Sequence, residues 1–109
     1  MPEVTVERRN SPRYSMVLAA DVIELSRGAR MSARTSDISR SGCYVDTLNP
    51  IPCGSRVKLR FTHHQEEFEA IGLVVYVSQS LGMGIQFTEV SHDQQARLND
   101  WLEAPPREF

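Results

Sequence analysis

The sequence predicts an all-β fold of about six short antiparallel strands, arranged as a barrel or a curled sandwich, with one helix at the C-terminus. Three observations predict it. Apolar and polar residues alternate over several short stretches, which is the spacing of strands. Turn-forming residues separate these stretches. Apolar residues at helical spacing occur near the C-terminus. A chain of 109 residues suffices for one such domain and not for two.

Two strands joined by a tight turn should open the domain. Residues 14–25 read as one long strand with apolar side chains on both faces, and residues 30–36 read as its hairpin partner. Gly28 lies between them, where the absence of a Cβ permits a positive φ. Residues 37–42 then form a turn, and residues 43–47 resume the pattern as a short strand.

The second half of the chain contains the clearest alternation. A loop with two prolines precedes a strand over residues 56–62. Residues 67–77 form another long strand, whose alternation places five residues on one face: Phe68, Ala70, Gly72, Val74 and Tyr76. Gly72 inside this strand indicates a bulge or a tight bend. A final strand covers residues 83–90.

The sequence predicts one helix with clear signals, and this helix begins at Ser91. Ser91 and Gln94 match the capping box, in which the Gln94 side chain reaches back to the Ser91 N–H. The helix has one apolar stripe, formed by Leu98, Trp101 and Leu102. Two prolines at 105 and 106 should end it near Glu103. The stripe is expected to cover an open end or an edge of the sheet.

Composition excludes several classes of protein. The formal net charge of −2 argues against a protein that coats nucleic acid or an anionic membrane. No apolar run is long enough to span a bilayer, and we expect no membrane insertion. Cys43 and Cys53 match no zinc motif and no disulfide framework, so we interpret both as small apolar residues in a reducing cytoplasm.

Catalysis and metal binding are not predicted. His63 and His64 should form a polar hairpin tip, because adjacent histidines at a strand end point to opposite faces and no third ligand is in evidence. No arrangement of nucleophile and base, or of paired carboxylates, has a credible spacing. We therefore expect no catalytic residues, no metal and no cofactor, and we expect Trp101 to lie in the core.

Two polar segments remain. Residues 1–13 form a predicted flexible arm with three guanidinium groups, those of Arg8, Arg9 and Arg13, ahead of a folded body at 14–104 and a tail at 105–109. Taken by itself, the arm is better explained as a solubilising terminus than as a ligand-binding segment. The turn at 37–42 carries an acidic corner. In an up-and-down barrel the arm and this corner can reach the same patch.

Together these groups suit a guanine nucleotide. The carboxylate of Asp37 can accept hydrogen bonds from the N1–H and N2 groups of guanine. An arginine matches the O6 and N7 edge, or stacks on the purine. The remaining guanidinium groups suit phosphates. Gly42, which lacks a Cβ, lets the backbone approach a ligand closely.

The chain resembles the PilZ domain family, the bacterial receptor module for cyclic di-GMP. The family signatures R-x-x-x-R and [D/N]-x-S-x-x-G occur as Arg9-Asn10-Ser11-Pro12-Arg13 and Asp37-Ile38-Ser39-Arg40-Ser41-Gly42. The stretch from Gly82 to Phe87 is also similar. The resemblance implies a six-stranded antiparallel PilZ-type β-barrel with a C-terminal helix.

The resemblance also implies the ligand contacts. Arg9 and Arg13 would hold the phosphates and a guanine, while Asp37, Ser39 and Gly42 would hold its other side. Arg40 and Ser41 are further candidates. Arg8, just before the first signature, implies an intercalated dimer of cyclic di-GMP, and the receptor would then signal to an unidentified effector protein.

Two other functions stay open. One is a nucleotide-independent interaction module on the same fold. The other is a small barrel that binds single-stranded nucleic acid, which requires a basic groove with exposed aromatics. We rank it last because the sequence has one arginine cluster.

Overall fold

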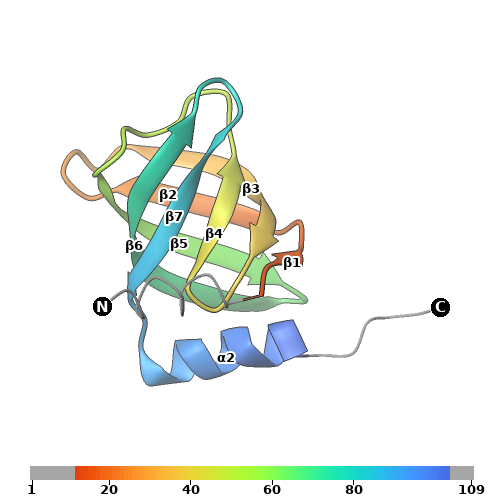
Figure 1. Cartoon of the computed structure of the whole chain (residues 1–109). Coiled ribbons are helices and arrows are strands. Elements are labelled where there is room, and N and C mark those ends of the chain that lie inside the picture. The colour runs from red at the N-terminus through yellow and green to blue at the C-terminus, as the bar shows by residue number, and fades with distance from the viewer. Residues whose placement is uncertain (1–11, 104–109) are drawn as a thin grey trace, which may run out of the picture.

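The computed structural model describes residues 12–103, which form a closed barrel with a helix across one end (Figure 1). This part of the chain contains seven strands and a helix: β1 (Tyr14–Ser15), β2 (Ala19–Glu24), β3 (Arg30–Ile38), β4 (Gly42–Asp46), β5 (Arg56–His63), β6 (Glu66–Ser78), β7 (Gly82–Glu89) and α2 (His92–Glu103). The all-β class with a C-terminal helix is confirmed.

Six of the strands make the barrel. They are hydrogen-bonded in the order β3-β2-β5-β6-β7-β4, every pair is antiparallel, and the β3–β4 pairing closes the ring. The expected up-and-down order is wrong at one point, because β4 and β5 are not neighbours. Their connection crosses one end of the barrel, where the buried side chain of Ile51 joins the core and its N–H donates to Sδ of Met83 at 3.4 Å.

The predicted first strand is divided in two. β1 pairs with the end of β3 and β2 with its beginning, and the chain between them leaves the ladder. The buried hydroxyl of Thr35 fills this interruption: it donates to the carbonyl of Met16 at 2.7 Å and accepts from the N–H of Leu18 at 3.0 Å. A side chain thus replaces missing ladder bonds, which alternation alone does not reveal.

α2 closes the opposite end of the barrel (Figure 1). The predicted apolar stripe is buried, and Trp101 lies in the core as expected while its indole Nε1–H donates to Glu66 at 2.9 Å. The core within the barrel is continuous with this stripe. Its largest apolar side chains with essentially no exposure are Phe61, Phe68, Ile38, Leu59, Met83 and Leu98.

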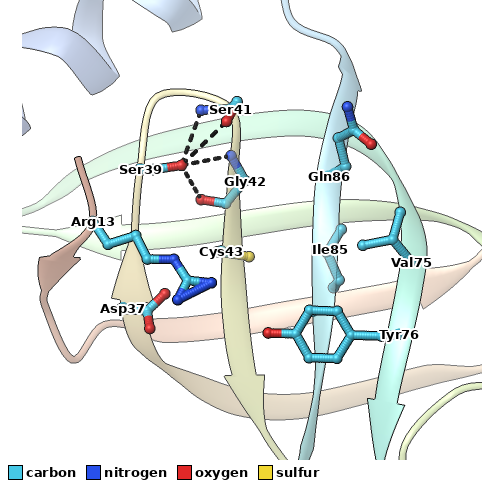
Figure 2. A pocket seen from close by; sticks show the side chains of 11 residues that line it. Arg13, Asp37, Ser39, Ser41, Gly42, Cys43, Val75, Tyr76, Ile85 and Gln86 are labelled. Carbon is cyan, nitrogen blue, oxygen red and sulfur yellow. Dashed lines mark hydrogen bonds between the residues drawn. The ribbon is translucent and has the colours of Figure 1, made fainter. Parts of the chain in front are cut away.

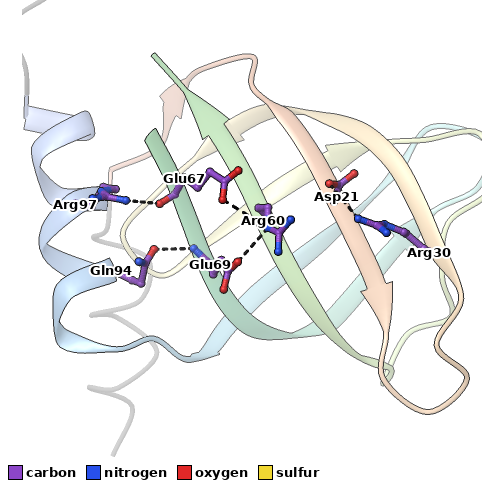
Figure 3. Close-up of polar contacts among 7 residues, drawn as sticks. All are labelled: Asp21, Arg30, Arg60, Glu67, Glu69, Gln94 and Arg97. Atoms are coloured by element: carbon purple, nitrogen blue, oxygen red, sulfur yellow. Dashed lines mark hydrogen bonds and ion pairs between the residues drawn. The ribbon is translucent and has the colours of Figure 1, made fainter. Parts of the chain in front are cut away.

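The start of α2 differs from the predicted capping box. The Ser91 hydroxyl accepts the Gln94 N–H at 3.2 Å, as expected. The side chain of Gln94, however, accepts the N–H of Glu69 in β6 at 2.7 Å and so does not complete the box. Arg97 donates to the carbonyl of Glu67 at 2.7 Å (Figure 3). Both contacts fasten the helix to the exposed edge of the β5–β6 hairpin.

Two turns show how local chemistry sets the hairpins. Gly28 has a φ of 71°, as its place in the β2–β3 turn predicted. His64 and Gln65 form the β5–β6 turn with φ values of 50° and 68°. The hairpin tip is therefore correct, but the histidine rings of 63 and 64 do not point to opposite faces, since their centroids are 4.0 Å apart. The left-handed backbone of His64 turns its side chain back toward its neighbour.

The cysteines differ in their surroundings. Cys43 is buried, as expected of a small apolar residue, whereas Cys53 is exposed, contrary to the apolar interpretation. Among residues 12–103 no group of three or more potential ligands could hold a metal ion. No helix in the same range combines the length and the apolar character needed to cross a bilayer.

Candidate functional site

The turn between β3 and β4 is built around the hydroxyl of Ser39. This oxygen accepts the N–H groups of Ser41 at 3.2 Å and Gly42 at 3.1 Å (Figure 2). The backbone of Ser39 also donates to the carbonyl of Gly42 at 2.8 Å. The turn proper is shorter than predicted, because Asp37 still belongs to β3 and Gly42 already begins β4. Ser39 therefore shapes the turn, because its hydroxyl accepts the two N–H groups that the turn would otherwise leave without a partner.

Gly42 is required by the packing of the barrel. It pairs with Gln86 in β7, and a Cβ on Gly42 would collide with the backbone carbonyl of Ile85. Only glycine lets β4 and β7 approach this closely. The glycine of the motif thus has a structural role whether or not a ligand approaches it.

Arg13 and Asp37 line the same pocket, although 23 residues separate them in the sequence. β1 brings them together, because Ser15 pairs with Asp37 and Arg13 lies just before that strand. The guanidinium of Arg13 extends toward Asp37 (Figure 2). Arg8 and Arg9 lie outside the described residues, so their predicted contacts stay predictions.

The pocket has a volume of about 320 Å³ and opens on the outer wall of the barrel. Most polar groups lie on the side of the β3–β4 turn, whereas β6 and β7 contribute aromatic and aliphatic side chains together with the polar Gln86 (Figure 2). Its lining consists of Arg13, Asp37, Ser39, Ser41, Gly42, Cys43, Val75, Tyr76, Gly84, Ile85 and Gln86.

Strand register explains how four strands contribute to one surface. Asp37 pairs with Tyr44, Tyr44 pairs with Gly84, and Gly84 pairs with Tyr76. These residues form a row across β3, β4, β7 and β6. Since paired residues of neighbouring strands project to the same face, the acidic group and the tyrosine look outward along one line.

Arg40 and Ser41 have different positions. Ser41 lines the pocket, and its hydroxyl lies 3.3 Å from that of Ser39. Arg40 is outside the lining, and its guanidinium pairs with Glu103 in the last turn of α2. A contact between Arg40 and a ligand stays a prediction.

Sequence reasoning missed the far wall of the pocket. The alternation of β6 placed Tyr76 on the same face as Val74, yet Val74 is buried and Tyr76 is 44% exposed. A register shift between these two residues rotates Tyr76 outward, in addition to the predicted bulge at Gly72. The one available signal is Gly82-Met83-Gly84, since two glycines in a strand indicate close approach of another group.

The electrostatics of the pocket favour binding over nucleophilic chemistry. Burial, and secondarily the negative charge of Asp37, raises the pKa of the Cys43 thiol. The thiol therefore stays protonated and is a poor nucleophile. The groups at the mouth are a carboxylate, which accepts, and a guanidinium, which donates in a planar fork. Such a pair suits a ligand with both hydrogen-bond donors and negative charge.

Comparison with solved structures identifies the fold. The PilZ domain of CeSA from a cellulose-synthesizing bacterium is 18% identical with a TM-score of 0.68, covering 84% of this chain and 94% of that one. The PilZ domain of Escherichia coli YcgR, solved with c-di-GMP, is 16% identical with a TM-score of 0.70, covering 84% and 86%. Borreliella burgdorferi PlzA, in complex with c-di-GMP, is 16% identical with a TM-score of 0.63, and the match covers 91% of this chain and 43% of PlzA.

Comparison with curated proteins gave no match. Comparison with protein families gave a match to the PilZ domain over residues 7–104, a range that includes the barrel and both motifs. The structures confirm the same architecture, a closed six-stranded barrel with one added strand and a C-terminal helix. This chain therefore belongs to the PilZ domain family.

Proposed function

We propose that this domain is a receptor for cyclic di-GMP. The observation that carries the proposal is the meeting of Arg13 and Asp37 at one pocket, beside the turn that Ser39 and Gly42 form. The solved domains of YcgR and PlzA contain this nucleotide, which supports the same ligand here.

The chemistry of the pocket fits the two parts of the ligand. Asp37 accepts hydrogen bonds from the N1–H and N2 groups of guanine, and its negative charge disfavours adenine, which has an acceptor at N1. Arg13 donates to a phosphate or to the O6 and N7 edge of a base. Arg9 supplies a second fork from the same arm. These roles would give one guanine an edge contact and one phosphate a counter-charge.

We further propose that the arm closes over the ligand and that Arg8 supports an intercalated dimer. A single molecule presents two phosphates and a dimer presents four, so a third guanidinium, that of Arg8, would find in the dimer a phosphate that one molecule does not offer. Ordering of the arm at the pocket would change the surface that the domain offers to an effector protein.

A nucleotide-independent interaction module is the alternative, favoured by exposed apolar residues at the barrel end opposite α2. Leu48 and Leu81 are 76% and 68% exposed, and a hydrogen bond of 3.0 Å from the N–H of Thr47 to the carbonyl of Leu81 holds their loops together. Binding of single-stranded nucleic acid has less support. Over the described strands, Arg30, Arg34, Arg56 and Arg60 are each paired with a carboxylate, which leaves no basic groove there.

Calorimetric titration with cyclic di-GMP separates these functions. A receptor binds with saturable stoichiometry, and Asp37→Asn weakens the binding because the amide offers a donor where guanine also has donors. An interaction module shows no heat of binding. An oligonucleotide mobility-shift assay at moderate salt tests the third function in parallel.

A further inference from the structure

The ring of Tyr76 lies over a glycine on the outer wall of the barrel. A Cβ on Gly84 would lie 2.6 Å from Cζ and 2.9 Å from Cδ2 of this ring, so the ring occupies the space that any other side chain would need. Figure 2 views the ring face-on from the solvent side, with its hydroxyl end directed toward β4. One face of the ring therefore covers backbone, and the other face lines the pocket.

A second tyrosine fixes this orientation. The centroid of the Tyr44 ring is 6.0 Å from that of Tyr76, with an interplanar angle of 33°, within the range of favourable aromatic pairs. Tyr44 itself leans over Gly82, where a Cβ would lie 2.7 Å from its Cε2. The glycines at alternate positions of β7 thus seat two rings side by side. A ring that is held in this way needs little ordering when a ligand arrives.

We propose that the exposed face of Tyr76 is a stacking platform for a guanine base, an inference that rests on the proposed function. The paired strands place Tyr76 in the same row as Asp37. Because the ring leans back over Gly84, it lies about two strand spacings, roughly 10 Å, from the backbone of Asp37. A purine on this ring can extend an edge across β4 toward the acidic side of the pocket.

The two residues then have separate tasks. Asp37 distinguishes guanine from adenine through its edge, whereas Tyr76 holds the flat face of a base whatever its identity, because every base has a π-face. A ring that merely covers Gly84 would stabilise the barrel and make no difference to binding. The proposal and this structural role predict different results for the same variants.

The first test compares cyclic di-GMP affinities by calorimetry. Tyr76→Ala is expected to lower affinity between about 5-fold and about 100-fold, as loss of one stacked base does. Tyr76→Phe keeps the ring face and should retain most of the affinity. Leu81→Ala is a matched control, because Leu81 is exposed on the β6–β7 turn and does not line the pocket. Equal affinities of the wild type and Tyr76→Ala would overturn the platform.

Tyr76→Leu guards against misfolding, since leucine keeps an apolar cover over Gly84 and removes the π-face. If Tyr76→Ala does not fold, the comparison of Tyr76→Leu with Tyr76→Phe decides the question. In NMR spectra, the upfield shift of a guanine H8 signal of the bound ligand should be larger with the wild type than with Tyr76→Leu, because base–base stacking within the ligand persists in both. An identical H8 shift in both would contradict stacking.

Base selectivity separates the platform from the proposed function. Tyr76→Ala should weaken cyclic di-GMP and cyclic di-AMP by the same factor, while Asp37→Asn should reduce the preference for cyclic di-GMP. A wild type that binds neither nucleotide overturns the receptor function and the platform with it. A wild type that binds cyclic di-GMP normally, with Tyr76→Leu unchanged, overturns the platform alone.

Discussion

The guanidinium of Arg40, on the turn between β3 and β4, pairs with the carboxylate of Glu103 in the last turn of α2. The turn that carries the candidate site is thereby linked to the end of the helix that closes the barrel. The arginine and the carboxylate side chains are 47% and 59% exposed, so solvent screens the pair and its contribution to stability is small. The pair can instead affect ligand binding, because Arg40 is also a candidate ligand contact.

If Arg40 also contacts a ligand phosphate, Glu103 competes for it. Glu103→Gln should then raise cyclic di-GMP affinity, and Arg40→Ala should lower it, with the unfolding free energy changed by no more than about 1 kcal/mol in either variant. Calorimetry and urea denaturation measure the two effects. An Arg40→Ala variant with wild-type affinity would show that Arg40 serves only the contact with the helix.

Ser39 is predicted to stabilise the turn between β3 and β4. Ser39→Ala leaves the N–H groups of Ser41 and Gly42 without their acceptor, and should lower the unfolding free energy by about 1–3 kcal/mol. Ser41→Ala is the matched control, because its hydroxyl has a partner only in Ser39 among the described residues. Urea denaturation should show a clear loss for Ser39→Ala and little for Ser41→Ala. Equal stabilities would contradict the role assigned to Ser39.

Arg8 is predicted to set the number of bound nucleotides. Arg8→Leu should reduce the calorimetric stoichiometry from about two nucleotides per chain to about one while binding persists, because the extra guanidinium that supports the second molecule is gone. Arg27→Leu, a substitution in the β2–β3 turn at the far end of the barrel, controls for loss of a positive charge. A stoichiometry that is the same in wild type and Arg8→Leu would refute the argument from Arg8.

The packing of His63 predicts a pH dependence of stability. Burial and the neighbouring His64 lower the pKa of His63 below its ordinary value of 6.5, while Glu66 opposes them. The ring also packs against Trp101 of α2 with centroids 5.1 Å apart. Since the folded state binds this proton less readily than the unfolded state, the stabilisation is complete above pH 6.5 and is lost as the pH falls below it.

His63→Gln should therefore flatten the loss of stability between about pH 7.5 and about pH 5.5 relative to the wild type. Denaturation midpoints over this range measure the difference, and His64→Gln, which removes only one of the two causes that lower the pKa of His63, should flatten the profile by less. Identical pH profiles for the wild type and His63→Gln would show that His63 does not contribute.

Alternation and turn chemistry predicted most of the barrel. The strands predicted at 56–62 and 83–90 lie within one residue of β5 and β7, because their periodicity is regular and a glycine stands just ahead of each. Three features were beyond such reasoning. The predicted first strand is interrupted between β1 and β2, where the Thr35 hydroxyl replaces ladder bonds; a bulge turns Tyr76 outward; and the β4–β5 connection crosses the barrel end. Each depends on contacts between residues far apart in the sequence.

The candidate site was predictable on one side only. The motif around Ser39 is local, so its turn follows from the residues themselves. The opposite wall depends on which residues of β6 and β7 face the motif, and strand register decides that. Arg13 could be placed near Asp37 only through β1, a strand of two residues whose pairing no periodicity reveals.

The most direct test of the receptor function is calorimetric titration of the full chain with cyclic di-GMP, alongside Arg9→Ala, Arg13→Ala and Asp37→Ala. We expect saturable binding by the wild type and a loss of about 2–4 kcal/mol of binding free energy in each variant, because each removes one charged member of a hydrogen-bonded pair with the ligand and leaves the other member unpaired. Wild-type affinity in all three variants, or no binding by the wild type, would contradict the account.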